Sequence, residues 1–237
     1  MTNSKTVGIM GGMGPAATVD LMQRIIAATP ASDDHDHIRM LVDNNPKVPS
    51  RIKALIDKTG PSPLPVLTNM AKQLSAQGAD LLAMPCNTAH HYYDELASAV
   101  DIPFLNIMEL VSAHIADQQP GFRRVGLLAS SALSTIALYE PWFGSRGAEV
   151  VYPPAAEQRA LMELIFAIKG NAGDSIGYAA MQSCAETLEA MHVDCLLIAC
   201  TELSVISEQL HTALPSYDAQ DILAHAVIAQ ASGTGIA

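Results

Sequence analysis

Two cysteines, Cys86 and Cys200, end two closely similar stretches of the sequence. Each stretch opens with an Asp, continues through an apolar run and reaches its cysteine six positions later, with polar residues following. A free cysteine titrates near about pH 8.5, so a modest shift of its pKa makes the thiol a usable acid or base at neutral pH. The pattern therefore predicts two matched thiols, each of which can serve in proton transfer.

A wider repeat contains these two stretches. The segment "AKQLSAQGADLLAMPCNT" (71–88) aligns without a gap on "AETLEAMHVDCLLIACTE" (185–202). Because this register holds across a helix, a strand and the turn after it, the sequence indicates an internal duplication. Two pseudo-symmetric halves favour a ligand site in the cleft between them. Similar pairs of segments lie upstream and downstream, at 6–12 with 124–130 and at 102–114 with 214–225.

The elements that must position the cysteines alternate between strands and helices, which predicts an α/β fold with mainly parallel sheets flanked by helices. Several strands are continuous apolar runs, as expected for strands covered on both faces. We expect two domains, the first formed by residues 1–102 plus 213–237 with a returning C-terminal helix, the second by residues 103–212. The predicted strands are 6–11, 38–44, 80–85, 102–107, 124–130, 148–153, 194–199 and 214–219. The predicted helices include 15–28, 64–78, 132–140, 156–169, 175–192 and 220–231.

Cys86 and Cys200 both lie where a predicted strand ends and a helix begins. Ligands of open α/β sheets bind beyond the carboxyl ends of the strands, and a helix N-terminus favours a thiolate. The other two cysteines, Cys184 and Cys195, lie within a predicted helix and a predicted strand. We expect these two to be buried as small hydrophobic side chains.

Composition excludes several classes of protein. Hydrophobic residues make up 49% of the 237 residues and charged residues only 16%, which is typical of a compact globular protein. The net charge of −11 argues against nucleic acid, whose recognition requires a basic face. No apolar run has the length of a membrane span or the pattern of a secretory signal, so we expect a cytoplasmic protein without a membrane partner.

Neither a metal nor a nucleotide is expected. The cysteines show no C-x-x-C spacing, and the acidic run "SDDHDHIRM" (32–40) is typical of a solvated loop before a strand. The glycine-rich turn "GIMGGMGP" (8–15) follows a strand but matches neither G-x-G-x-x-G nor a P-loop.

Five motifs, in this order, resemble the aspartate/glutamate racemase family, and its aspartate racemase branch most closely. The motifs are "MGGMGP", "NNPKVPSR", "PCNTAH", "IKGN" and "ACTEL". The resemblance runs over nearly the whole chain and implies a homodimer that uses no cofactor. It implies that Cys86 and Cys200 flank the α-carbon of a small acidic amino acid: one, as thiolate, removes the α-proton, and the other, as thiol, delivers a proton to the opposite face.

The resemblance also implies the substrate contacts. Arg51 and Lys169 match positions that bind the carboxylates in aspartate racemases. Donors that stabilise the enolate-like intermediate are implied at Asn87, Thr88 and Thr201, and residues that line the pocket at Gly12 and Met13. Many relatives carry a Thr-rich turn where this chain has "SSALS" (130–134); Ser130 keeps only a hydroxyl there and is expected to contact the substrate, and the departure leaves the substrate preference open. Glutamate racemases typically carry Thr-His where this chain has Thr201-Glu202. Glu202 is expected either to orient the second thiol within the substrate site or simply to favour a helix N-terminus. His90 belongs to the first cysteine motif and is expected to tune Cys86 or to cap the turn.

Three functions stay open at this point. The first is a racemase for aspartate, with glutamate as a further candidate substrate. The second is an enzyme like the maleate isomerases of the same superfamily, which also use two cysteines. The third is a non-catalytic amino-acid-binding protein, although binding alone requires neither thiol.

Overall fold

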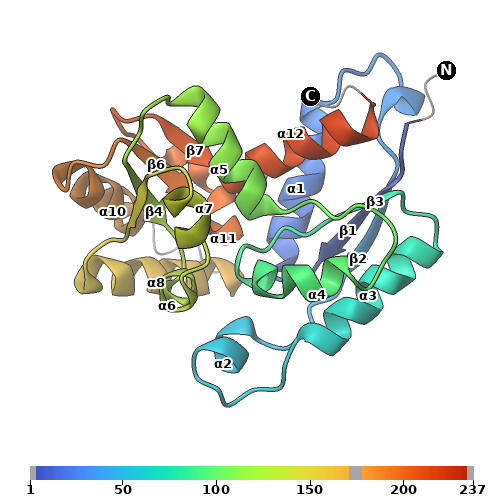
Figure 1. Cartoon of the computed structure of the whole chain (residues 1–237), viewed down its shortest axis with the longest axis horizontal. Coiled ribbons are helices and arrows are strands. Elements are labelled where there is room, and N and C mark those ends of the chain that lie inside the picture. The colour runs from blue at the N-terminus through green and yellow to red at the C-terminus, as the bar shows by residue number, and fades with distance from the viewer. Residues whose placement is uncertain (1–3, 171–177, 234–237) are drawn as a thin grey trace. The chain divides into compact units, whose positions relative to one another are not determined.

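A computed structural model describes residues 4–170 and 178–233 of the chain. The chain divides into two compact units, the first made of Met1–Leu110 and Gln220–Ala237 and the second of Val111–Ala219. These boundaries lie further along the chain than the expected ones after residues 102 and 212. Each unit has its own sheet (Figure 1).

The first unit contains a three-stranded parallel sheet. Its strands are β1 (Val7–Gly11), β2 (Met40–Asn44) and β3 (Leu81–Ala83), in the order β2-β1-β3. The helices of this part of the chain are α1 (Pro15–Ala28), α2 (Arg51–Leu55), α3 (Leu64–Ala76), α4 (Tyr93–Ala97) and α12 (Ala219–Ala231), with short 3-10 helices η1 (Asp34–Asp36) and η2 (Thr88–Tyr92). Helix α5 (Ile107–Gln118) leads from the first unit into the second.

The second unit contains a four-stranded parallel sheet. Its strands are β4 (Arg124–Leu128), β5 (Glu149–Val151), β6 (Cys195–Ile198) and β7 (Ser216–Asp218), in the order β5-β4-β6-β7. Its helices are α6 (Ser131–Ile136), α7 (Glu140–Gly144), α8 (Ala155–Lys169), α10 (Ala179–Ala190) and α11 (Thr201–Ser204), with the 3-10 helix η3 (Ser207–Gln209). The predicted α/β fold with parallel sheets flanked by helices is confirmed.

Two predicted elements differ in the structure. The expected strand 102–107 is reduced to one isolated bridge between Phe104 and Leu82, and α5 begins at Ile107. The expected helix 132–140 is divided into α6 and α7, because Ala137 adopts a left-handed backbone conformation with φ of 49°. The first three residues of the predicted helix 175–192 lie outside the described residues, and the described part of the prediction contains α10.

The duplication predicted from the sequence is also seen in the packing of each unit. In both, residues of the helix and of the strand that carries the cysteine pack against a glycine of the central strand. A Cβ atom added to Gly8 of β1 would lie 2.7 Å from a side-chain atom of Leu82, 3.0 Å from Ala79 and 3.2 Å from Leu74. The matching Gly126 of β4 meets the matching three residues, Leu196, Val193 and Leu188, at 3.0, 3.1 and 3.2 Å. In both units a leucine of the preceding helix and two residues at the start of the cysteine strand therefore pack tightly over the glycine of the central strand.

An Asp precedes each of the strands β3 and β6, which lead to Cys86 and Cys200, and it makes the same hydrogen bonds in both units. The Asp80 carboxylate accepts a hydrogen bond from the Thr6 N–H at 2.7 Å, and the Asp80 N–H donates to the Thr6 carbonyl. In the second unit, the Asp194 carboxylate accepts from the Arg124 N–H at 2.8 Å, and the Asp194 N–H donates to the Arg124 carbonyl. Each Asp thus fixes the start of its cysteine strand against the central strand.

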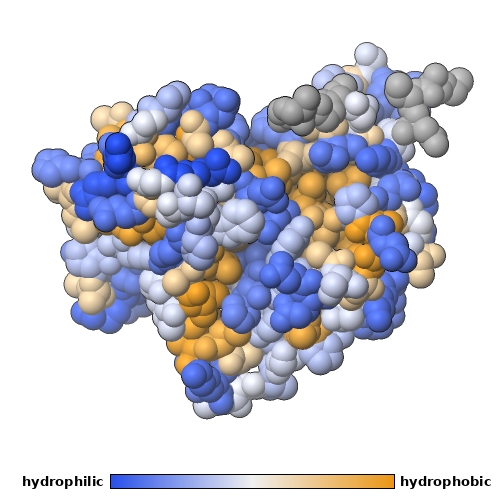
Figure 2. Space-filling view, viewed as in Figure 1, coloured by the Kyte–Doolittle hydropathy of each residue, from blue (hydrophilic) through white to orange (hydrophobic). Residues whose placement is uncertain are grey.

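Both faces of the first sheet are covered. Side chains three residues apart on a strand point to opposite faces, so Gly8 faces α3 while Gly11 faces Thr18 of α1. This double coverage explains why β1 is buried along its whole length and reads as an apolar run. On the surface, hydrophilic side chains cover much of the face shown in Figure 2, with hydrophobic ones in smaller patches.

Candidate active site

Cys86 and Cys200 occupy matching places in their units. Cys86 follows β3, which ends at Ala83, and Cys200 follows β6, which ends at Ile198. Both therefore lie beyond the carboxyl end of a strand in a parallel sheet, where ligands of such sheets bind. The cysteines that were expected to be structural, Cys184 and Cys195, are completely buried.

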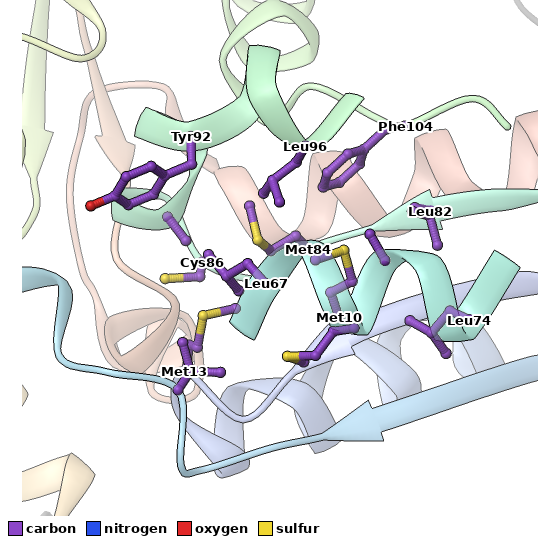
Figure 3. Close-up of a cluster of buried hydrophobic side chains, with 14 of the residues drawn as sticks. Met10, Met13, Leu67, Leu74, Leu82, Met84, Cys86, Tyr92, Leu96 and Phe104 are labelled. Atoms are coloured by element: carbon purple, nitrogen blue, oxygen red, sulfur yellow. The ribbon is translucent and has the colours of Figure 1, made fainter. Parts of the chain in front are cut away.

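The surroundings of Cys86 are mainly apolar. Its side chain is 6% exposed and belongs to a cluster of buried hydrophobic residues with Met10, Met13 and Met84 (Figure 3). Its N–H donates to the Met84 carbonyl at 2.8 Å. The Cys86 thiol is thus packed among hydrophobic side chains, several of which are methionines.

The glycine-rich turn after β1 lies at the same edge of the sheet, because β1 and β3 are parallel neighbours. Gly12 has a φ of +90°, and a Cβ atom there would lie 2.2 Å from the carbonyl carbon of Asn45. Its N–H donates to Thr18 Oγ1 at 2.8 Å. Glycine is therefore required at this position, and the tight turn places Met13 in the cluster that contains Cys86.

Asn87 and Thr88 follow Cys86 directly and form the start of η2. Asn87 is 3% exposed, and Thr88 is partly buried. Both side chains carry hydrogen-bond donors, and both lie within two residues of the thiol along the chain. Their contact with a substrate stays a prediction.

Arg51 begins α2 in the segment after β2. Its Nη1 donates to the carbonyl of Pro49 at 2.9 Å and to that of Val48 at 3.4 Å. These bonds attach the guanidinium to its own turn, at the carboxyl side of β2. The sequence predicts the cation but not these bonds.

The surroundings of Cys200 are polar. Its thiol, 7% exposed as a residue, donates to Glu202 Oε2 at 3.1 Å. The other oxygen of Glu202, Oε1, lies 3.4 Å from Lys169 Nζ at the end of α8. Glu202 is only 5% exposed, so a buried thiol and a buried carboxylate lie together, next to the more exposed ammonium group of Lys169.

This arrangement raises the pKa of the Cys200 thiol well above its usual value. Burial is the largest cause, the negative charge of Glu202 is the next, and Lys169 acts in the opposite direction. In the free protein Cys200 is therefore a protonated thiol at neutral pH, with its proton directed at the carboxylate.

Ser130 and Thr201 complete the sites predicted in the second unit. Ser130 precedes α6 and is 6% exposed, and Thr201 is the first residue of α11 and is 3% exposed. Ser130 follows β4 and Thr201 follows β6, which is the parallel neighbour of β4, so both lie at the same edge of their sheet.

One partly buried polar pair near Cys200 is not predicted by the sequence. Ser204, at the end of α11, donates from its hydroxyl to the Asp218 carboxylate at 2.6 Å. Asp218 is the last residue of β7 and pairs in register with Ile198, two residues before Cys200. The repeat offers a signal for this pair, since Ser204 stands four residues after its cysteine, as His90 does.

The acidic run 32–40 forms a local capped turn. The Asp36 carboxylate accepts from the N–H groups of Ser32 and Asp33, and that of Asp33 accepts from the Asp34 N–H. Within residues 4–170 and 178–233, no three His, Cys, Asp or Glu side chains are grouped so that they could hold a metal ion.

Over the same residues, no helix combines the length and the hydrophobicity that crossing a membrane requires.

Comparisons with known proteins agree on one family. The sequence model of the Asp/Glu/Hydantoin racemase family matches residues 10–227. The structure is similar to that of the Picrophilus torridus aspartate racemase, with a TM-score of 0.85, 32% identity and coverage of 97% of this chain and 94% of the other.

Two further relatives extend this comparison. The broad specificity amino-acid racemase RacX of Bacillus subtilis (strain 168) is 29% identical over 226 residues, which cover 94% of this chain and 96% of the relative. The glutamate racemase isoform RacE1 of Bacillus anthracis shares the fold at 16% identity, with a TM-score of 0.64 and coverage of 100% and 84%. This chain belongs to the Asp/Glu/hydantoin racemase family and is a racemase enzyme.

Proposed function

We propose that the protein interconverts L- and D-aspartate without a cofactor, and that Cys86 and Cys200 act on opposite faces of the α-carbon. The observation that carries the proposal is the matched position of the two thiols, each beyond the strand that pairs with the central strand of its unit. A racemisation is nearly mirror-symmetric, because each thiol removes the proton in one direction and supplies it in the other. A duplicated chain provides two such positions.

In the proposed step, the sulfur of one cysteine gains a proton and the sulfur of the other cysteine loses one. One thiolate takes the α-proton, the electron pair of the broken C–H bond passes into the α-carboxylate, and an enolate-like species forms. The other thiol then gives its proton to the opposite face of the carbon and becomes a thiolate. Proton transfer of this kind accounts for about 10²–10⁴-fold of the rate, so donors aimed at the growing negative charge must supply much of the remainder.

Glu202 is the proposed proton acceptor of Cys200. Before Cys200 can act as a base, its thiol must lose its proton, and the Glu202 carboxylate lies 3.1 Å from the sulfur. Lys169 neutralises part of the charge on Glu202 from 3.4 Å and so limits how strongly the carboxylate holds that proton. The exchange keeps one proton within the pair of residues.

The enolate-like charge and the carboxylates of the substrate need donors and cations. Asn87, Thr88 and Thr201 are the proposed donors, with Gly12, Met13 and Ser130 as lining residues; Arg51 and Lys169 are the proposed cations. A guanidinium can bind a carboxylate through two parallel hydrogen bonds, which fixes the orientation of the substrate.

A wider substrate range is the second candidate. The ion pair with Glu202 offsets the charge of Lys169, so a substrate carboxylate must compete for this cation. A side chain without a carboxylate meets no such competition, and the similarity to a broad specificity racemase supports the same candidate. Glutamate and neutral amino acids therefore belong in the substrate panel beside aspartate.

A homodimer in the cytoplasm is also proposed, on the basis of the family resemblance. Analytical ultracentrifugation of the purified protein would test the dimer: a sedimentation coefficient of a 25.1 kDa species at all concentrations would contradict it.

Incubation with L- and D-aspartate in D₂O tests the proposed function. The purified protein is used with a reducing agent and without pyridoxal phosphate, and chiral chromatography is read together with deuterium at the α-carbon. We expect the opposite enantiomer to form with the wild type and to be lost in Cys86→Ala and Cys200→Ala. Cys184→Ala is the matched control, since it removes a cysteine outside the proposed site.

The outcomes separate the alternatives. If a folded wild-type protein neither inverts nor exchanges any amino acid of the panel, the proposal is wrong. Conversion of maleate would then indicate an isomerase, and saturable binding of aspartate without exchange would indicate a binding protein.

A further inference from the structure

The main-chain carbonyls of the two cysteines are held by different groups. The Cys200 carbonyl accepts from the N–H groups of Leu203 at 2.9 Å and Ser204 at 3.1 Å, because α11 begins directly after the cysteine. This is the ordinary first turn of a helix, in which the residue before the helix is fixed by main-chain bonds. The Ser204 hydroxyl lies further from this carbonyl, at 3.5 Å, so the two main-chain N–H groups make the shorter bonds to Cys200.

After Cys86 the chain takes a different course. The turn that follows is the 3-10 helix η2, and the N–H of His90, four residues after Cys86, donates to the Asn87 carbonyl at 3.0 Å. The group that lies at hydrogen-bond distance from the Cys86 carbonyl is the imidazole of His90, with Nδ1 2.9 Å from the oxygen. At Cys86, the side chain at the fourth position thus makes the short contact that main-chain N–H groups make at Cys200.

The protonation of His90 follows from its burial. His90 is 4% exposed, and desolvation lowers its pKa to about 4, against the smaller opposing effect of the Cys86 and Leu105 carbonyls. At neutral pH the ring is uncharged and has a single N–H. Nε2 lies 3.4 Å from the Leu105 carbonyl, further than the 2.9 Å of Nδ1 from the Cys86 carbonyl, so the shorter contact assigns the proton to Nδ1.

The ring itself is held against the sheet. It stacks on Tyr93, with ring centroids 6.2 Å apart and planes 8° apart, and it contacts Phe104 at a centroid distance of 6.2 Å. The Tyr93 hydroxyl donates to the Phe104 carbonyl at 2.9 Å, and the Leu105 N–H donates to the Leu82 carbonyl of β3 at 2.9 Å. The imidazole therefore joins the cysteine turn to a segment that is bonded to β3.

We propose that His90 is the positioning residue of Cys86, with its Nδ1–H holding the Cys86 carbonyl and so fixing the backbone from which the thiol projects. The kinetic part of this proposal rests on the proposed function, in which Cys86 is a catalytic thiol. In this role His90 acts through the main chain of Cys86, since its ring nitrogens face the Cys86 and Leu105 carbonyls.

Two substitutions separate positioning from packing. His90→Leu keeps an apolar side chain of similar size but has no donor, whereas His90→Asn packs less well but keeps an N–H donor at the position of Nδ1. A misplacement of about 1 Å can cost about 10²-fold in rate. We therefore expect kcat to fall about 10–100-fold in His90→Leu with KM within about twofold, and to stay within about fivefold of the wild type in His90→Asn.

His91→Leu is the control, because this neighbouring histidine is exposed, and its kcat should equal that of the wild type. Urea unfolding of each variant shows what part of its change comes from stability. If His90→Leu is as active as His90→Asn or more active, His90 serves packing alone and the proposal is wrong.

Nitrogen-15 NMR of the imidazole in the wild-type protein tests the hydrogen bond without any variant or substrate. The expected result is a neutral ring protonated at Nδ1 between pH 6 and 8; protonation at Nε2 would overturn the proposal. This result holds or fails independently of racemisation. An inactive wild type would refute the proposed function while the NMR result still decides the role of the imidazole.

Discussion

Cys86 and Cys200 have the same place in the fold and different electrostatic surroundings. Thioether and aliphatic side chains surround Cys86, whereas Cys200 faces a carboxylate that is paired with an ammonium group. The environment of the thiol therefore differs between Cys86 and Cys200, although the proposed reaction is nearly the same on both faces of the α-carbon. Differences between the two half-reactions should originate at Glu202.

Glu202→Gln tests this at the scale of one residue. The substitution keeps the size of the side chain and removes the proton acceptor, so we expect kcat to fall about 10²–10⁴-fold, the usual contribution of a general base. The same change removes a negative charge that raises the pKa of Cys200. Alkylation of Cys200 by iodoacetamide at pH 8 should therefore become faster while turnover becomes slower.

Glu208→Gln is the matched control, since Glu208 is exposed in η3. Steady-state kinetics and mass spectrometry of the alkylated peptides provide the two readouts. A kcat within threefold of the wild type, or slower alkylation of Cys200, would contradict the assigned role of Glu202.

The sequence identifies these residues but not their contacts. Glu202 is two residues after Cys200, and residues two apart in a helix do not face each other. The contact exists because Cys200 has an extended backbone just before α11, with φ of −139° and ψ of 117°. Such a departure from regular geometry at one residue is not encoded in the hydrophobic pattern. The bonds of Arg51 to its own turn likewise depend on loop geometry.

At the scale of elements, the close approach of helix and strand is the repeated feature. Gly8→Ala places a methyl group 2.7–3.2 Å from three side chains, and Gly126→Ala places one 3.0–3.2 Å from the matching three. Overpacking of this kind typically costs about 1–3 kcal/mol. We expect both variants to lose stability within this range in urea unfolding, Gly8→Ala more than Gly126→Ala.

Gly144→Ala provides the comparison, because a Cβ atom there has nothing within 4 Å. Its free energy of unfolding should be unchanged or slightly higher, since alanine favours a helix over glycine. Equal free energies of unfolding for all three variants would contradict the prediction, since the side chains near Gly8 and Gly126 would then make room for a methyl group without loss of stability.

The elements themselves were largely predictable. Continuous apolar runs identify the central strands, and the period of the helices α1, α3 and α8 is clear from the sequence. The strand expected at 102–107 is short because Pro103 has no N–H to donate to a neighbouring strand. The break at Ala137 could not be predicted, because a left-handed conformation is rare outside glycine.

For the molecule as a whole, the buried thiols predict a loss of stability in alkali. Burial, the largest cause, raises the pKa of Cys184 to about 11 and that of Cys195 to about 12. A group whose pKa is raised by folding stabilises the protein fully below its unfolded pKa and loses that contribution as the pH rises toward the folded pKa. The free energy of unfolding should therefore decrease from about pH 9 to about pH 12.

Urea unfolding at intervals from pH 7 to pH 11, with a reducing agent, measures this decrease. Each such thiol adds at most about 1.4 kcal/mol per pH unit to the slope. Cys195→Ala should have a lower stability at pH 7 and a shallower slope above pH 9. A free energy of unfolding that is constant up to pH 11 would contradict the prediction.

The order of the two units along the chain has a consequence for synthesis on the ribosome. The second unit is one continuous segment, whereas the first needs residues from both sides of it. In the first unit, Gln220 donates to the Ala17 carbonyl at 3.0 Å, Asp221 pairs with Arg24 at 3.5 Å, and the Ala231 carbonyl accepts from the Lys5 N–H. A growing chain therefore makes β1, β2 and β3 first but must complete the whole second unit before α12 can join them. The first unit to begin is the last to finish, and for that interval α1 is left without the helix that it will pack against.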